Sequence, residues 1–109
     1  MPRSAPLAAC LLLLVAAPPD ADAQDVAAGR SIARQKCAPC HAVGRSGESR
    51  VRAAPAFRTL AGRYDVDDLE EALVEGIAVK HGDVEMPEFQ FTPAAAAALI
   101  AYIKSVGKK

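Results

Sequence analysis

The sequence predicts an all-α domain, in which three main helices and one short helical turn are joined by loops. Three segments carry apolar residues at the three- and four-residue spacing of a helix. No segment shows the sustained alternation of apolar and polar residues that is typical of a half-buried strand, and there is no internal repeat. Stretches rich in Gly, Pro, Ser and Arg separate the helical segments and predict loops.

The first helix is predicted to begin at about Asp25 and to continue to the cysteine pair at residues 37–40. Asp is a preferred N-cap residue, because its side chain accepts hydrogen bonds from free backbone N–H groups. Gly29 and Ala33 are small for core positions, and small residues allow a second helix to approach closely. The inward face of the helix consists of Val26, Gly29, Ile32 and Ala33.

A loop and a short turn precede the second helix. Residues 44–52 have no apolar period, and Pro55 leads from them into a helical turn over residues 57–61. The helix itself is predicted over residues 66–77. Asp65 is its cap, and acidic residues crowd its first turn, where they complement the positive end of the helix dipole. The apolar stripe consists of Leu69, Leu73, Gly76 and Ile77.

Residues 79–91 contain Gly and Pro without a helical period, and they predict a loop. Thr92-Pro93 marks the start of the last helix, because a hydroxyl cap followed by proline at the first helical position is a strong start signal. This helix is predicted to run to about Val106 and to end at Gly107. Its inward face is Leu99, Ile103 and Val106, with Tyr102 beside them, and the lysines that complement its dipole are Lys104, Lys108 and Lys109.

The first 23 residues have the layout of a secretory signal peptide. Arg3 supplies a positive start, residues 7–17 form a short apolar stretch, and Ala21-Asp22-Ala23 offers a small-x-small cleavage site. The stretch is too short to span a bilayer, so an uncleaved anchor is the less favoured alternative. We therefore expect cleavage after Ala23, one mature domain over residues 24–109 in the periplasm, and no stable membrane insertion.

The mature domain is small, and its charge is nearly balanced. A chain of this length buries a core of marginal stability, so a covalently held group at its centre would add the apolar surface that it lacks. The full chain has 13 Lys and Arg residues and 13 Asp and Glu residues. This balance disfavours nucleic acid as a partner, since proteins that bind nucleic acid usually present a strongly basic face.

Cys37-Ala38-Pro39-Cys40-His41 is the attachment signature of a c-type haem. Two thiols one short turn apart can each form a thioether with a vinyl group of the porphyrin, and the adjacent His41 then binds the iron as its proximal ligand. A zinc site would need four ligands, and the mature chain offers only these three and His81. A dithiol oxidoreductase also uses Cys-x-x-Cys, but it would place a strand before the motif, where this chain has a helical pattern.

Met86 is the predicted distal ligand of the iron. It is the single methionine of the mature chain, and Pro87 favours an extended backbone at that position. Electron carriers commonly pair His with Met at the iron. One alternative is that Met86 fills a gap in the core, although no apolar stripe surrounds it. The other is that His81 is the second ligand. A histidine in such a polar turn is usually solvated, so Met86 is preferred.

These features resemble a class I cytochrome c of the small bacterial periplasmic type. The resemblance covers essentially all of residues 24–109. It rests on the motif at residues 37–41, on Met86-Pro87 in a late loop, and on Leu99-Ile100-Ala101-Tyr102-Ile103 in the last helix. It implies the cytochrome c fold, wrapped around one covalently bound haem c.

Two further roles are implied by the resemblance. In this family the first and last helices cross tightly, with a glycine meeting an aromatic residue, and Gly29 and Tyr102 match those positions. A proline after the motif offers its carbonyl to the free nitrogen of the proximal histidine, and Pro55 is the residue that matches. The chain departs from the family at Ala33, where an aromatic residue is common, and it contains no Trp.

With both axial positions of the iron filled, the expected activity is one-electron transfer rather than catalysis by the chain itself. The expected partners are redox proteins: a donor dehydrogenase and an acceptor oxidase or cytochrome. Two alternatives remain open, namely a haem subunit bound tightly to a periplasmic dehydrogenase or oxidase, and a gas-binding or peroxidatic haem protein. Arginines in residues 44–63 and acidic residues in residues 64–75 predict a charge dipole that orients the partner.

Overall fold

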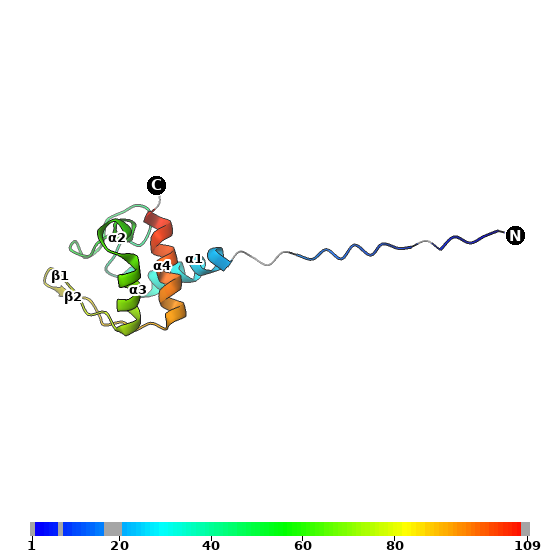
Figure 1. The fold of residues 1–109 in the computed structure, drawn as a ribbon. Helices are drawn as coiled ribbons and strands as arrows, with labels where there is room; N and C mark the ends of the chain where they lie inside the picture. Colours follow the sequence, from blue (N-terminus) through cyan, green and yellow to red (C-terminus); the bar gives the residue numbers. More distant parts are fainter. Residues whose placement is uncertain (1, 7, 17–20, 108–109) are drawn as a thin grey trace.

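In a computed structural model, which describes residues 2–6, 8–16 and 21–107, helices form the body of the molecule (Figure 1). The described residues before residue 17 are extended and run away from this body. Leu7 and residues 17–20, which belong to the predicted signal peptide, lie outside the described residues. No helix in the described part of the chain is long and apolar enough to cross a membrane. Cleavage after Ala23 stays a prediction.

The first helical segment consists of α1 (Ala21–Ile32) and a single π-helical turn, η1 (Ala33–Cys37). The prediction that Asp25 caps the helix is wrong, because α1 begins before it. Alanine is a strong helix former, and no helix breaker separates the alanines at the start of α1 from Asp25. The sequence does not predict the π turn, in which the Ala38 N–H donates to the Ala33 carbonyl at 2.9 Å.

Two shorter helices follow a loop: α2 (Phe57–Arg63) and α3 (Val66–Glu75). α2 confirms the predicted helical turn and extends it to Arg63. Asp65 caps α3 as predicted, since its Oδ1 accepts a hydrogen bond of 2.8 Å from the Asp67 N–H. The predicted stripe is wrong at residues 76–77, because α3 ends at Glu75 and the chain then becomes extended.

The described part of the chain has the predicted helical body with one addition, a small antiparallel hairpin at residues 80–85 within the segment that is predicted to be a loop. β1 (Lys80–His81) pairs with β2 (Val84–Glu85), and an isolated bridge joins Ile77 to Phe89. The turn contains two residues and begins with Gly82, whose φ of 62° suits the first turn position of a type II′ hairpin. The strands are too short to show alternation, and the Gly-Asp pair is the one sequence signal that indicates them.

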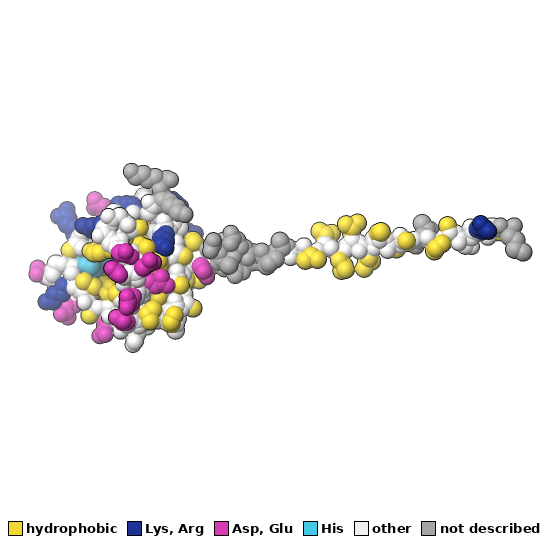
Figure 2. All heavy atoms as spheres, in the orientation of Figure 1, with side chains coloured by type: hydrophobic (Ala, Val, Ile, Leu, Met, Phe, Trp, Pro, Cys, Tyr) yellow, Lys and Arg dark blue, Asp and Glu magenta, His cyan; other side chains and the backbone are white. Residues whose placement is uncertain are grey.

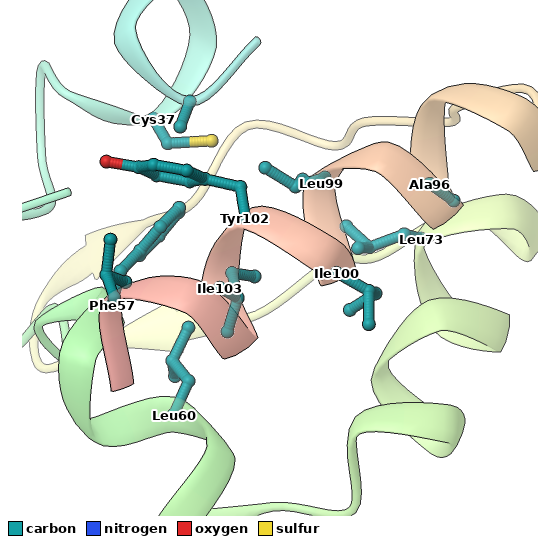
Figure 3. Close-up of a cluster of buried hydrophobic side chains, with 11 residues drawn as sticks. Cys37, Phe57, Leu60, Leu73, Ala96, Leu99, Ile100, Tyr102 and Ile103 are labelled. Carbon is teal, nitrogen blue, oxygen red and sulfur yellow. The ribbon is translucent and has the colours of Figure 1, made fainter. Parts of the chain in front are cut away.

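α4 (Pro93–Gly107) runs through the body and contributes more core side chains than any other element (Figure 3). Thr92 caps it as predicted, because its Oγ1 accepts from the Ala95 N–H at 3.2 Å. Leu60 of α2 and Leu73 of α3 pack into the same cluster. Lys108 and Lys109 lie outside the described residues. The predicted inward face is confirmed, since the following are buried: Leu99, Tyr102, Ile103 and Val106.

α1 and α4 approach each other closely at Gly29, as the resemblance implies. A Cβ atom at Gly29 would lie 2.6 Å from the carbonyl carbon of Ala98 and 2.7 Å from the Cβ of Tyr102. Both distances are far below normal van der Waals contact, which is about 3.5–4.0 Å between carbons. Only glycine therefore allows α1 to lie this close to α4.

Candidate functional site

The Cys-x-x-Cys-His segment begins where the π turn ends. Cys37 is the last residue of η1, and the chain then folds back on it. The N–H groups of Cys40 and His41 both donate to the Cys37 carbonyl, at 3.1 and 2.9 Å. Cys37 and His41 are buried, and Cys40 is half-buried. One short turn thus brings together the two thiols and the imidazole that the sequence singled out.

The loop after this turn brings Pro55 to His41. It is closed at the first residue of α2, where the Phe57 N–H donates to the Ala42 carbonyl at 2.9 Å. Within the loop, His41 Nδ1 lies 2.7 Å from the Pro55 carbonyl oxygen. A carbonyl oxygen only accepts hydrogen bonds, so Nδ1 carries the proton. In the neutral ring, Nε2 therefore keeps its lone pair and is free to bind a metal.

Burial sets the protonation of the site. It lowers the pKa of His41 below the usual value; the Pro55 hydrogen bond opposes this shift, and the neighbouring His81 adds to it. His41 is therefore neutral at neutral pH, which is the form that binds metals. Burial, together with the nearby Cys40, raises the pKa of the Cys37 thiol to about 11. Dithiol oxidoreductases lower the pKa of their reactive thiol, so this shift disfavours that alternative.

A cavity of about 360 Å³ adjoins the motif. Its size lies in the range of roughly 300–1,000 Å³ that is usual for ligand and cofactor sites. Cys37, His41 and Met86 line it. A smaller cavity of about 120 Å³ is lined by these three residues and by Cys40. The larger cavity has an apolar wall from the helices, formed by Phe57, Leu60, Leu73, Leu99 and Ile103.

These donors fit a haem. The site combines two adjacent thiols, an imidazole with a free Nε2, a thioether and an apolar wall. Haem c requires thiols for its thioether bonds, nitrogen or sulfur atoms for its iron, and an apolar surround for its ring. The structure brings together all five residues that the sequence proposed, which are Cys37, Cys40, His41, Pro55 and Met86. Their roles toward the haem stay predictions.

The hairpin places Met86 and His81 beside the motif. The Met86 N–H donates to the Val79 carbonyl at 2.8 Å, which extends the pairing of β1 and β2 by one step. The expectation of a solvated His81 is wrong. This residue is half-buried, and its ring meets the ring of His41 edge-on, with 5.2 Å between the ring centroids. The pairing of β1 with β2 directs the side chain of His81 toward His41. The polar residues next to His81 in the sequence do not indicate this orientation.

Tyr102 has a role that its place in the helix does not predict. Its hydroxyl donates to the Val43 carbonyl at 2.6 Å, and its ring lies beside Cys37 (Figure 3). Val43 follows His41 by two residues, so this bond ties the end of the motif to α4. No local pattern signals the bond, because the two residues are 59 positions apart in the sequence.

Residues 24–103 match a family model described as cytochrome C oxidase, cbb3-type, subunit III. The chain belongs to this family of c-type cytochromes. The matched region contains both the Cys-x-x-Cys-His motif and Met86. In two further comparisons, no curated protein and no solved structure matched the chain. As a c-type cytochrome, the protein uses haem for electron transfer and works with redox partners.

Proposed function

We propose that this cytochrome is a periplasmic one-electron carrier with a single haem c, attached through Cys37 and Cys40 and ligated by His41 and Met86. The observation that supports this most directly is the shared cavity: His41 and Met86 line the same apolar space, next to Cys37. With both axial positions filled, the iron has no open position for a substrate. The chain then transfers electrons and is not itself an enzyme.

The polypeptide supports this role by orienting its ligands and by lining the cavity with apolar side chains. The Pro55 carbonyl holds the ring of His41 and makes Nε2 a stronger donor, as acceptors on the far nitrogen of ligating histidines do. Leu99 and Ile103, each 2 % exposed, form part of the apolar wall of the cavity. A bound haem supplies one-electron exchange between Fe(II) and Fe(III), at a potential that His/Met ligation raises.

A haem subunit of a periplasmic dehydrogenase or oxidase is the second candidate. The match to a family described as an oxidase subunit favours it. Affinity purification of the tagged protein from periplasm and membranes separates the two functions. Recovery as a single polypeptide supports the free carrier, whereas stoichiometric recovery with a catalytic subunit supports the second candidate.

Visible and near-infrared spectra test the ligation in protein expressed with a periplasmic haem-attachment system. We expect a low-spin c-type spectrum with a Met-to-ferric-iron band, and we expect Met86→Ala to remove this band. Absence of covalent haem would refute the proposal and restore the dithiol alternative. Rapid CO binding by the reduced, unsubstituted protein at neutral pH would indicate an open distal position, and therefore a gas-binding or peroxidatic haem protein.

Export can be tested separately from ligation. Residues 1–23 support a cleaved signal peptide by their layout alone. N-terminal sequencing of protein recovered from the periplasm should begin at Gln24. Protein that keeps its first residues and sediments with the membrane would contradict cleavage and favour an uncleaved anchor.

The charged surface supports an oriented encounter with the partner. Figure 2 shows acidic side chains gathered on one face of the body. Arg50 and Arg52 are exposed in the loop that follows the motif. Replacing both with Glu should slow electron transfer to an acidic partner at low salt and should weaken its salt dependence. An unchanged salt dependence would contradict this orientation. The acidic residues of α3 are Asp67, Asp68, Glu70, Glu71 and Glu75.

A further inference from the structure

His81 carries a polar atom without a partner. Its Nε2 is the single buried side-chain nitrogen or oxygen that lacks a hydrogen bond within the described part of the chain. Buried polar groups are almost always paired, because an unpaired one loses its hydration without compensation. The unpaired Nε2 of His81 lies beside the cavity of the motif. An imidazole nitrogen in such a place can bind a metal ion or form a hydrogen bond with a bound group.

The register of the hairpin explains why His81 points toward this cavity. Directly paired residues of an antiparallel hairpin present their side chains on the same face. His81 pairs with Val84, and Val79 lies opposite Met86, so these four side chains share one face. The cavities agree with this assignment, because His81 and Met86 line both of them. Lys80 and Glu85 form a pair on the opposite face.

The hairpin therefore presents two groups that can bind iron, a thioether and an imidazole, to the space beside His41. The ring of His81 already contacts the ring of His41, with centroids 5.2 Å apart. We propose that His81 is a reserve axial ligand, which binds the haem iron whenever Met86 does not. This inference rests on the His41/Met86 ligation proposed above.

Exchange of the two ligands needs no oxidant, reductant or further reactant. Met86 would leave the iron, the imidazole of His81 would bind in its place, and no electron would be transferred. Both states leave the iron six-coordinate, so a chain that loses Met86 from the iron still excludes CO and other small ligands. The imidazole state has a lower reduction potential, since Met ligation raises it. A reserve ligand would thus alter the potential of the carrier without opening it to oxygen chemistry.

Three variants of the haem-loaded protein test the proposal: Met86→Ala, Met86→Ala with His81→Ala, and Met86→Ala with Lys80→Ala. The Lys80 variant is the matched control, because Lys80 is adjacent in the chain but belongs to the opposite face. The readouts are the spin state in the visible spectrum and the rate of CO binding to the reduced protein. Neither readout depends on electron-transfer activity.

We expect Met86→Ala to remain low-spin without the methionine band, and the Lys80 control to match it. Adding His81→Ala should convert the haem to high-spin. CO should then bind about tenfold faster or more. If His81 occupies the iron in about nine of ten molecules of the Met86→Ala protein, only one in ten has an open distal position, whereas all molecules of the double variant have one. Free imidazole should restore the low-spin spectrum of the double variant, which shows that its cavity is intact. If the alanine pair does not retain haem, Met86→Leu with His81→Gln preserves side-chain volume and gives the same comparison.

A high-spin Met86→Ala protein that binds CO as fast as the double variant would overturn the reserve role. The unsubstituted protein separates this failure from that of the proposed function, because its methionine band reports Met86 ligation independently of His81. A methionine band that is absent from the unsubstituted protein, with low-spin character lost on His81→Ala alone, would make His81 the primary ligand. That result would refute both the reserve role and the proposed Met86 ligation.

Discussion

Gly29→Ala should destabilise the folded protein, although alanine is the better helix former. In an exposed helix, alanine is favoured over glycine by about 1 kcal/mol. At Gly29, however, the new methyl group would overlap the carbonyl oxygen of Ala98 and would lie 2.6 Å from its carbonyl carbon. These are backbone atoms, so no change of rotamer relieves the clash. The two helices must move apart by about 1 Å to restore normal contact.

The magnitude follows from these two opposing effects. Overpacking a core contact lowers the free energy of unfolding by about 1–3 kcal/mol, or more where backbone must move. The value at Gly29 belongs at the upper end of this range, because the clash is with backbone atoms. Subtracting the gain in helix propensity leaves a net loss of about 2 kcal/mol. For a domain of this size, that loss lowers the melting temperature by about 8–16 °C. Thermal unfolding of the haem-loaded protein, followed by far-ultraviolet circular dichroism, measures the shift.

Gly62→Ala is the matched control, because Gly62 lies in α2 and a Cβ there would have no atom within 4 Å. It should stabilise the protein by about 0.5–1 kcal/mol through helix propensity and reduced chain entropy in the unfolded state. A Gly29→Ala protein as stable as the unsubstituted chain would refute the close approach of α1 and α4. An equal loss of stability in both variants would show that the effect is not specific to this contact.

Three other substitutions or treatments have defined outcomes. Tyr102→Phe should lower the free energy of unfolding by about 1–2 kcal/mol in urea titrations, because the Val43 carbonyl loses its buried donor while the ring is retained; an unchanged midpoint would contradict the bond. Pro55→Ala should keep the hydrogen bond to His41, since the acceptor is a main-chain atom, and should cost about 0.4–1 kcal/mol through greater freedom of the unfolded chain. Its reduction potential should match that of the unsubstituted protein, and a clear shift would show that proline itself orients the ring. In the folded, haem-free chain, burial holds the pKa of Cys37 at about 11, and the raised pKa disfavours the reactive thiolate. Its alkylation at pH 8, measured by peptide mass spectrometry, should therefore be about 100-fold slower than that of a thiol with pKa 9 and should accelerate up to about pH 11; a plateau near pH 9 would contradict the shift.

The helices could be predicted from the sequence because their signals are local. Asp65 and Thr92 cap the helices that follow them, and apolar spacing identifies the buried face of α4. The cysteine pair and His41 are contiguous, so the sequence alone brings them together. Met86 is predicted from the residues alone, because it is the single methionine of the mature chain and precedes a proline, whereas Pro55 is implied by the family resemblance. The structure places both beside the motif.

The hairpin and its consequences depend on pairing between residues, which a local pattern does not encode. Each strand has two residues, too few for alternation to be visible. The polar sequence neighbours of His81 favour a solvated side chain, yet strand pairing turns it toward His41. The hydrogen bond between Tyr102 and Val43 is equally invisible, since it joins the last helix to the loop after the motif. The sequence therefore identifies the candidate haem ligands, but not the hairpin that positions Met86 and His81.

The π turn at the end of the first helix has a mechanical consequence. Gly29, Ala33 and Cys37 are all buried and follow one another every four residues. In a regular α-helix such a series drifts around the axis by about 40° per step, because four residues turn through about 400°. The wider turn of η1 takes up part of this drift, so the buried line of the first helix continues to Cys37. The helical segment from Gly29 to Cys37 is about 12 Å long and is packed closely against α4 at Gly29. A rotation of the helix at Gly29 would therefore change the direction of the Cys37 thiol at the other end of the segment.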